Sequence, residues 1–374
     1  MNPTETKPKR KLFLLAGEAS GDLYGGQLAQ ALLTLDPDLE IRGWGGEAME
    51  AAGVRISTHY KELAFMGFWE VLKNLGTIRR NLNRCTAEIL AFQPDAFVGI
   101  DFPGFNLRVA ANMTKSGIFT HHYISPSIWA WNARRIHRIK RSVQRMHVAM
   151  PFELAAYESV GMDARFVGHP LISLLEAAPK EDLEIDSSLP ILALLPGSRT
   201  QELKHLLPVM IKTAQSLPQF QAVIAGAPGQ EPAAYAQAIE AGIPVVFNKT
   251  RDLMRCSSAG LVTSGTATLE ASLLGLPQII CYRTSSLTYR IAKLLAQVAW
   301  IGLPNIILGG LAIPERIQAD CNANTLRQDV LSLHDGKDWT PTGQTQQSLA
   351  VKLKALLGSE SAASNTAVSI MERL

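Results

Sequence analysis

Short apolar runs alternate along this chain with longer segments whose apolar residues recur at helical spacing. Runs of about five residues that end in a polar or turn-forming stretch are typical of buried strands in parallel β-α-β units. We predict nine such strands: Lys11–Ala16, Glu40–Gly43, Ala96–Ile100, Thr120–Ile124, Met146–Met150, Ile191–Leu195, Gln221–Ala225, Gly260–Thr263 and Gln278–Tyr282. The alternation runs through the chain twice, which favours an α/β protein with two Rossmann-like domains.

The best candidate for a domain boundary is Gly168-His169-Pro170, which is followed by a charged segment and a new strand. Proline and polar clusters mark places where few contacts cross the chain, and 374 residues suit about two domains. We expect a basic, disordered tail over 1–10, an N-terminal domain over 11–170, a C-terminal domain over 171–344 and a helical tail over 345–374. Whether the tail helix crosses back to the N-terminal domain stays open.

Composition excludes several classes of protein. Apolar residues make up 47% and charged residues 18%, and no apolar run approaches the roughly 18–20 residues that span a bilayer. The four cysteines are far apart, so neither a zinc site nor a disulfide framework is indicated. The apolar stretch after the basic N-terminus is too short for a signal peptide, and we expect a cytoplasmic protein.

One window of the N-terminal half is strongly basic. No acidic residue occurs between Asp101 and Glu153. The window holds Arg108, Lys115, Arg134, Arg135, Arg138, Lys140, Arg141 and Arg145. Such a patch attracts an anionic partner, but it lacks a recognisable DNA- or RNA-binding module. We therefore expect no nucleic acid, and an anionic lipid surface or a phosphorylated substrate remains.

Aromatic and basic residues also lie together between two predicted strands. Phe65, Phe68, Trp69, Leu72 and Leu75 share one helical stripe, with arginines up to Arg84 beside it. Such a helix suits a membrane interface. A stripe that packs on the protein's own sheet is the equal alternative.

Two turns in the C-terminal half are typical of phosphate binding. Ser264-Gly265-Thr266 follows a buried strand and opens a helix, so free backbone N–H groups point at an anion. Glu270, one turn later, can accept two hydrogen bonds from a ribose. Pro196-Gly197-Ser198-Arg199 ends an earlier strand and offers a cation to a diphosphate. Either turn alone is often structural, but together they favour a nucleotide site.

Carboxylates end two strands of the N-terminal half. Glu18 follows the first strand, and Asp101 follows Val98-Gly99-Ile100. A carboxylate there can take a proton from a sugar hydroxyl, although a strand-end Asp is commonly a helix cap. His121 and His122 end a third strand, and the pattern does not decide which of them faces a cleft.

These residues together resemble the bacterial lipid-A-disaccharide synthase family. The motifs that carry the resemblance run in order over about residues 11–335: Ala16-Gly17-Glu18-Ala19-Ser20-Gly21-Asp22, Val98-Gly99-Ile100-Asp101, Tyr123-Ile124-Ser125-Pro126-Ser127-Ile128-Trp129-Ala130-Trp131, Leu194-Leu195-Pro196-Gly197-Ser198-Arg199, Ser264-Gly265-Thr266-Ala267-Thr268-Leu269-Glu270 and Leu303-Pro304-Asn305. The SPSIWAW run is highly specific.

The resemblance implies a metal-independent GT-B glycosyltransferase without a cofactor, whose two domains face a cleft. It would join UDP-2,3-diacylglucosamine to 2,3-diacylglucosamine 1-phosphate with inversion, and release UDP. The enzyme would be peripheral on the inner face of the inner membrane. The basic window would hold the acceptor's 1-phosphate and bind the anionic leaflet. The oligomeric state stays open.

The resemblance also assigns residues. It implies that the catalytic base is Asp101 first, with Glu18 or His122 next. Residues assigned to the UDP side are Arg199, Ser264, Gly265, Thr266, Glu270, Arg283 and Asn305, with Tyr282 nearby. One departure is Gly104, because the family often has a second Asp there.

Two alternatives use the same motifs. A UDP-GlcNAc 2-epimerase or another UDP-GlcNAc-dependent GT-B enzyme also needs a diphosphate turn and a ribose glutamate. A nucleotide-binding adaptor at a lipid surface would need no catalysis.

The aromatic segment yields a first test. If Phe68 and Trp69 insert into a lipid interface, replacing both with Ser should leave the melting temperature nearly unchanged and reduce binding to anionic vesicles. If they are core residues, the loss should be about 3–5 kcal/mol each, enough to unfold a typical domain. Thermal melts and vesicle co-sedimentation on one sample distinguish the two, and a collapse in stability with vesicle binding intact would rule out the membrane interpretation.

Overall fold

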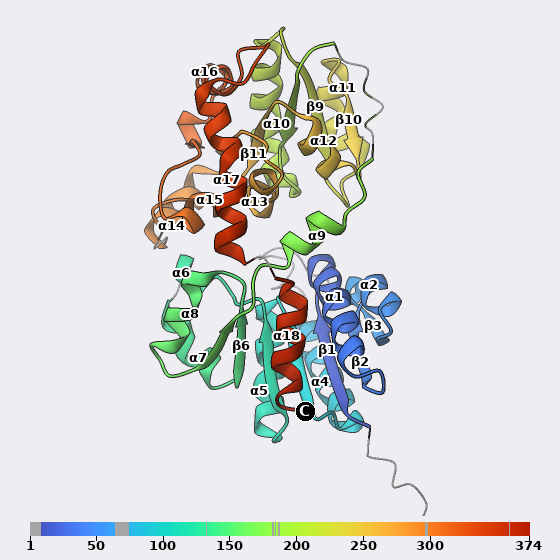
Figure 1. Ribbon diagram of the computed structural model, residues 1–374. Coiled ribbons are helices and arrows are strands. Elements are labelled where there is room, and N and C mark those ends of the chain that lie inside the picture. Colours follow the sequence, from blue (N-terminus) through green and yellow to red (C-terminus); the bar gives the residue numbers. More distant parts are fainter. Residues whose placement is uncertain are drawn as a thin grey trace, which may run out of the picture. The chain divides into compact units, whose positions relative to one another are not determined.

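The computed structural model describes residues 9–374 except 64–74, 132, 182, 184, 186–187, 296–297 and 359. The described chain forms two compact units, one within Met1–Pro170 and Leu357–Leu374, the other within Leu171–Leu356. Each unit contains one parallel sheet flanked by helices (Figure 1). The predicted α/β fold with two Rossmann-like domains is therefore confirmed.

The first unit is built on a seven-stranded sheet in the order β3-β2-β1-β4-β5-β6-β7. Its strands are β1 (Lys11–Ala16), β2 (Glu40–Gly45), β3 (Arg55–His59), β4 (Ala96–Ile100), β5 (Phe119–Tyr123), β6 (Arg145–Val148) and β7 (Asp163–Phe166). Its helices are α1 (Ala19–Leu35), α2 (Glu47–Ala51), η1 (Tyr60–Leu63), α4 (Leu75–Phe92), α5 (Pro103–Lys115), α6 (Ile128–Trp131), η2 (Ala133–Arg135), α7 (Ile136–Lys140), α8 (Pro151–Glu158) and α18 (Ala362–Met371).

The second unit is built on a six-stranded sheet in the order β10-β9-β8-β11-β12-β13. Its strands are β8 (Ile191–Leu195), β9 (Gln221–Gly226), β10 (Val245–Phe247), β11 (Ala259–Thr263), β12 (Gln278–Tyr282) and β13 (Glu315–Ile317). Its helices are α9 (Leu171–Ala177), α10 (Thr200–Gln215), η3 (Pro232–Tyr235), α11 (Ala236–Glu240), α12 (Thr250–Cys256), α13 (Thr266–Leu273), α14 (Ser286–Leu295), α15 (Leu303–Leu308), η4 (Gln318–Asp320), α16 (Ala323–Leu333) and α17 (Pro341–Leu357).

Both sheets reverse their winding at one place. The chain builds outward from β1 to β3, then returns to the other side of β1 with β4; in the second sheet it does the same between β8 and β11. β1 pairs with β4 in the register Ala16↔Ile100, and β8 pairs with β11 in the register Leu195↔Val262. Ligands of open parallel sheets bind beyond the carboxyl ends of the strands at such a reversal.

The predicted aromatic stripe lies mostly outside the described residues, because Phe65, Phe68, Trp69 and Leu72 fall within 64–74. The described helix that comes next in the chain is α4, which packs on the sheet core through Cys85, Ile89 and Phe92. None of the described helices combines the length and the apolar character needed to cross a bilayer.

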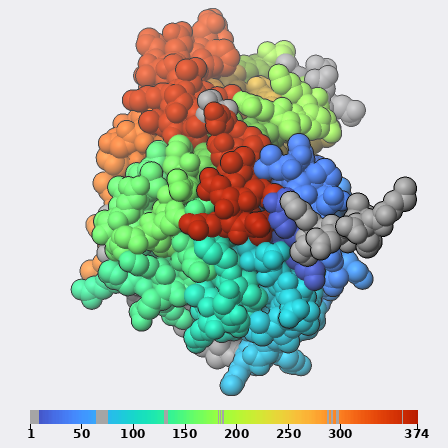
Figure 2. Space-filling model, turned by 60° about the horizontal axis from the view of Figure 1, so that its bottom comes forward, coloured from blue at the N-terminus to red at the C-terminus, as the bar shows by residue number. Residues whose placement is uncertain are grey.

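The C-terminal helix belongs to the first unit. α18 packs against α1, and Figure 2 shows the red C-terminal segment directly against the blue N-terminal one. A buried arginine holds it there: Arg145 on β6 donates to the carbonyl oxygen of Ser369 at 2.7 Å and pairs with Glu372 at 2.8 Å. The same guanidinium pairs with Asp163 at 2.7 Å. Arg145 thus ties the last helix to the sheet.

We expect Arg145→Ala to destabilise the first unit by about 2–4 kcal/mol, because breaking a buried ion pair leaves its partners unpaired, although the two carboxylates are partly solvated. The matched control is Arg165→Ala. Arg165 also pairs with Asp163, at 3.3 Å, but is exposed, so its loss should cost less than about 1 kcal/mol. Amide hydrogen exchange of α18 would report the difference, and equal protection in both variants would contradict the role of Arg145.

Candidate active site

In the second unit, a glutamate already occupies the turn after β8. Gly197 has a φ of 107°, and a Cβ there would lie 2.4 Å from Glu202 Oε2, so the turn needs glycine. Glu202 accepts hydrogen bonds from the backbone N–H groups of Ser198 at 3.1 Å and Arg199 at 3.3 Å. Arg199 Nη1 pairs with Glu202 Oε1 at 2.9 Å. Its side chain is 78% exposed, so it can leave this ion pair to reach an anion.

The turn after β11 lies beside the first. Thr263 Oγ1 donates to the carbonyl oxygen of Leu195 at 2.8 Å, which joins the two strand ends, and Ser264 Oγ donates to that of Ile301 at 2.8 Å. α13 begins at Thr266. A pocket of 340 Å³ takes its lining from both turns, including Arg199, Ser264, Gly265 and Thr266. The structure thus brings together four of the residues predicted for the UDP side.

Glu270 lies in an adjoining pocket of 470 Å³. Pro228 and Thr250 line both pockets, so the two hollows are neighbours. Burial raises the pKa of Glu270, and Arg251, whose Nη2 is 3.5 Å from Glu270 Oε1, partly offsets that rise. A largely buried carboxylate with one long ion pair has acceptor capacity left for a ligand hydroxyl.

The remaining candidates for the UDP side, Tyr282, Arg283 and Asn305, do not line the 340 Å³ pocket. Burial and, after it, the carboxylate of Glu202 raise the pKa of Tyr282, the last residue of β12. Arg283 follows β12. Asn305 is fully buried. Its amide donates to the carbonyl of Ile313 and to Glu315, and its oxygen accepts from the N–H groups of Ala312 and Ile313.

The side-chain amide of Asn305 therefore uses both of its N–H donors and both acceptor positions of its oxygen in hydrogen bonds within its own loop. Direct contacts of Asn305 and Arg283 with UDP stay predictions. What the structure shows for Asn305 is that it fixes the turn after α15.

In the first unit, two carboxyl groups meet at the reversal of the sheet. Glu18 follows β1 and Asp101 follows β4, and the two carboxyl groups are close enough for the charge of Glu18 to act on Asp101. Burial and the negative charge of Glu18 raise the pKa of Asp101 to about 6. A carboxyl whose pKa lies near neutrality suits a general base.

The backbone at Asp101 is held in an uncommon conformation. Asp101 and Phe102 have φ values of 48° and 43°, in the left-handed region that non-glycine residues rarely adopt. Asn106 Nδ2 clamps this turn, donating to the carbonyls of Asp101 at 2.8 Å, Ile100 at 3.1 Å and Leu15 at 3.1 Å. The Phe102 ring packs so closely on Gly17 that a Cβ there would lie 2.1 Å from it. Sequence reasoning missed Asn106, which looks like an ordinary polar position on a helix.

Both histidines of β5 are buried. His121 Nδ1 lies 3.0 Å from His147 Nε2 in a stacked pair. His122 lies beside Gly99 and Asn106, and burial together with Arg135 lowers its pKa to about 4. His122 is therefore neutral at pH 7 and a weak base.

The SPSIWAW motif is anchored by a second buried carboxyl group. Trp129 Nε1 donates to Glu153 Oε1 at 3.0 Å, and the Trp129 ring meets Phe152 edge-on. Burial raises the pKa of Glu153 to about 7, although hydrogen bonds with Ser125 and Trp129 pull it down. Glu153 was not predicted from the sequence, because its partner Trp129 lies 24 residues earlier in the chain, with α7 and β6 between them.

Among the described residues, no group of three or more His, Cys, Asp or Glu side chains lies close enough to hold a metal ion. The two candidate clusters thus consist of a carboxyl pair in one unit and a cation with a small-residue turn in the other.

Known proteins place this chain in a family. The family model described as lipid-A-disaccharide synthetase matches residues 12–369. A lipid-A-disaccharide synthase of Geobacter metallireducens is 36% identical, with 99% of this chain and 98% of the relative covered. One of Neisseria meningitidis serogroup A is 39% identical, with 86% and 88% covered.

Solved structures of lower identity share the fold. A putative UDP-N-acetylglucosamine 2-epimerase of Listeria monocytogenes superposes with a TM-score of 0.69 at 13% identity, over 98% of this chain and 96% of that one. The calicheamicin glycosyltransferase CalG4 superposes with a TM-score of 0.63 at 15% identity, over 98% and 99%. Both likenesses support the two-domain GT-B architecture, and the sequence matches over nearly the whole length show that the chain belongs to the lipid-A-disaccharide synthase family, glycosyltransferases of lipid A biosynthesis.

Proposed function

We propose that this glycosyltransferase joins UDP-2,3-diacylglucosamine to 2,3-diacylglucosamine 1-phosphate with inversion at the anomeric carbon. The products are a β-1,6-linked disaccharide 1-phosphate and UDP. Family membership supports the reaction class, and it does not favour the epimerase or adaptor alternatives.

One observation carries the assignment of roles. In each unit the chemically distinct residues gather at the carboxyl ends of the two strands where the sheet reverses: Glu18 and Asp101 after β1 and β4, Arg199 and Ser264 after β8 and β11. A proton acceptor in one unit and a diphosphate-type turn in the other match the needs of acceptor and donor.

Asp101 is the base in this proposal. Its ionised carboxylate takes the proton of the acceptor 6-hydroxyl while that oxygen attacks the anomeric carbon. The bond from that carbon to the diphosphate oxygen breaks, and the electron pair leaves with UDP. Glu18 acts on Asp101 through its charge: burial and, after it, the charge of Glu18 raise the pKa of Asp101 to about 6, high enough to hold the proton that it accepts.

Arg199 and the turn at Ser264 stabilise the charge that grows on the diphosphate. Arg199 exchanges its exposed ion pair with Glu202 for the ligand. Glu270 accepts hydrogen bonds from the ribose hydroxyls in the adjoining pocket. These contacts use only protein groups.

We also propose that the enzyme binds peripherally to the inner face of the inner membrane. The exposed basic residues of the acid-free window from residue 102 to 152 supply positive charge for an anionic leaflet. Arg145 of the same window does not contribute, because it is buried and paired with Asp163 and Glu372.

Mass spectrometry of a reaction with the two acylated monosaccharides tests the function. We expect the lipid disaccharide phosphate and one equivalent of UDP. A parallel reaction with soluble UDP-GlcNAc alone should release no UDP and form no epimer. Turnover of UDP-GlcNAc without the lipid disaccharide would overturn the proposal in favour of an epimerase or another transferase.

Asp101→Asn should lower turnover by about 10²–10⁴ while UDP affinity stays near wild type. In the wild type, kcat/KM should fall about tenfold per pH unit below pH 6, where Asp101 gains its proton. Glu18→Gln removes the charge that raises this pKa, so the acid limb should move to lower pH. If the acid limb stays in place in Glu18→Gln, Glu18 does not influence the pKa of Asp101. A normal rate in Asp101→Asn would assign the role of catalytic base to Glu18 or His122.

Glu270→Ala should weaken UDP binding about ten- to a hundredfold, since a charge-assisted hydrogen bond contributes about 1.5–3 kcal/mol. Glu270→Gln keeps the shape and should lose less. The matched control is Glu240→Ala, an exposed glutamate of α11 away from both pockets. Isothermal titration calorimetry checks all three, and wild-type affinity in a folded Glu270→Ala protein would remove Glu270 from the site.

A further inference from the structure

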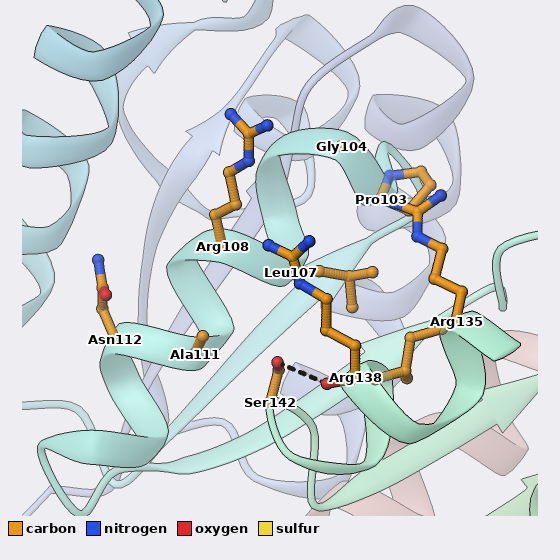
Figure 3. Close-up of a pocket in the computed structure, with 10 residues that line it drawn as sticks. Pro103, Gly104, Leu107, Arg108, Ala111, Asn112, Arg135, Arg138 and Ser142 are labelled. Atoms are coloured by element: carbon orange, nitrogen blue, oxygen red, sulfur yellow. Dashed lines mark hydrogen bonds between the residues drawn. The ribbon is translucent and has the colours of Figure 1, made fainter.

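A pocket of 290 Å³ opens in the first unit beside the strand end that carries Asp101. One wall is the start of α5, with Pro103 and Gly104 following Asp101 in the chain. The other wall is the η2–α7 segment. Figure 3 shows Arg135 and Arg138 reaching from that segment toward α5, which contributes Arg108.

The pocket is basic and unneutralised. Three arginines line it together with no acidic residue. Over the part of the chain that the structure describes, none of the three forms an ion pair. Five other arginines of the same unit have a carboxylate partner: Arg10, Arg42, Arg84, Arg145 and Arg165. The three around this pocket differ from the remaining unpaired arginines of the described chain because they share one hollow.

Three like charges around one hollow repel each other unless an anion lies between them. Guanidinium groups offer planar pairs of N–H donors that match the oxygens of a phosphate. The volume admits a phosphate and part of the group that it esterifies, but not an acyl chain as well. Leu107, Ala111 and Ile139 supply an apolar side to the same hollow.

Gly104 keeps the pocket open. A Cβ at this position would meet nothing within 4 Å, and the residue stands in the first turn of a helix. A side chain could therefore enter the hollow here without a steric clash. Because position 104 carries none, no carboxylate competes with an incoming anion.

We propose that Arg108, Arg135 and Arg138 bind the phosphate group of the acceptor glycolipid, which positions its hydroxyl for Asp101. This inference rests on the proposed function, and it names the residues that recognise the acceptor. Proximity in the chain between Asp101 and the pocket wall favours the acceptor over a bilayer headgroup, which would also present a phosphate.

The main experiment compares two acceptors in detergent micelles: 2,3-diacylglucosamine 1-phosphate and the same glycolipid without phosphate. Wild type should prefer the phosphorylated acceptor in kcat/KM. In the double variant Arg135→Ala/Arg138→Ala, the KM for the phosphorylated acceptor should rise about tenfold or more, with kcat and the donor KM nearly unchanged. Its preference for the phosphate should collapse. The control Arg55→Ala removes an exposed arginine of β3 that lies outside both the pocket and the basic window, and it should behave as wild type.

A second pair of variants isolates charge from folding. Gly104→Asp and Gly104→Asn add side chains of nearly equal size, and an acid at a helix start favours the helix. Gly104→Asp should raise the acceptor KM well above that of Gly104→Asn. Equal KM values for the two would contradict the proposal.

Vesicles separate the two sources of phosphate. Binding to phosphatidylglycerol vesicles that falls in the double arginine variant, with acceptor preference unchanged in micelles, would assign the pocket to bilayer headgroups and overturn the inference. A wild-type enzyme that makes no lipid disaccharide would instead refute the proposed function. An active wild type whose acceptor preference survives the double substitution would refute the arginine site alone.

Discussion

A parallel sheet that winds outward from its central strand in two directions leaves an opening where the winding reverses. Each crossover must carry the chain back over the sheet, so the connections after β1 and β4, and after β8 and β11, diverge from the strand ends. Residues far apart in the chain meet there without any long loop. The carboxyl pair of the first unit and the cation-bearing turn of the second both exist because of this constraint.

The same constraint explains which strands the sequence reveals. All nine predicted strands are present, and they are the strands with neighbours on both sides. The edge strands β3, β7, β10 and β13 were missed. Their residues are largely half-buried, as in Val245–Phe247 and Glu315–Ile317, and their runs are short and mixed, so no apolar run marks them.

The site residues fall into those that belong to local sequence motifs and those whose partners are distant in the sequence. The turns at Ser198 and Ser264 are local patterns, and the structure places them side by side at one pocket. Asn106 and Glu153 act on partners distant in the sequence, where periodicity carries no information. Glu202 could have been predicted from the sequence. It lies three residues after Arg199, the N-cap of α10, and a glutamate at that position is a known capping arrangement. The hydrogen bonds of Asn305 within its own loop depend on side-chain geometry that no motif encodes, and the predicted UDP contacts of Asn305 and Arg283 stay predictions.

The return of α18 to the first unit has a consequence for biosynthesis. A ribosome releases the chain from its N-terminus, so the strands around β1 emerge long before the helix that covers α1. Roughly 190 residues separate the two parts, which at about 5–20 residues per second corresponds to about 10–40 s of translation. Throughout that interval Arg145 has no Glu372 or Ser369 to bind, and the surface of α1 that packs against α18 stays uncovered. Until α18 has been synthesised, the nascent first unit therefore exposes apolar surface that the folded unit buries.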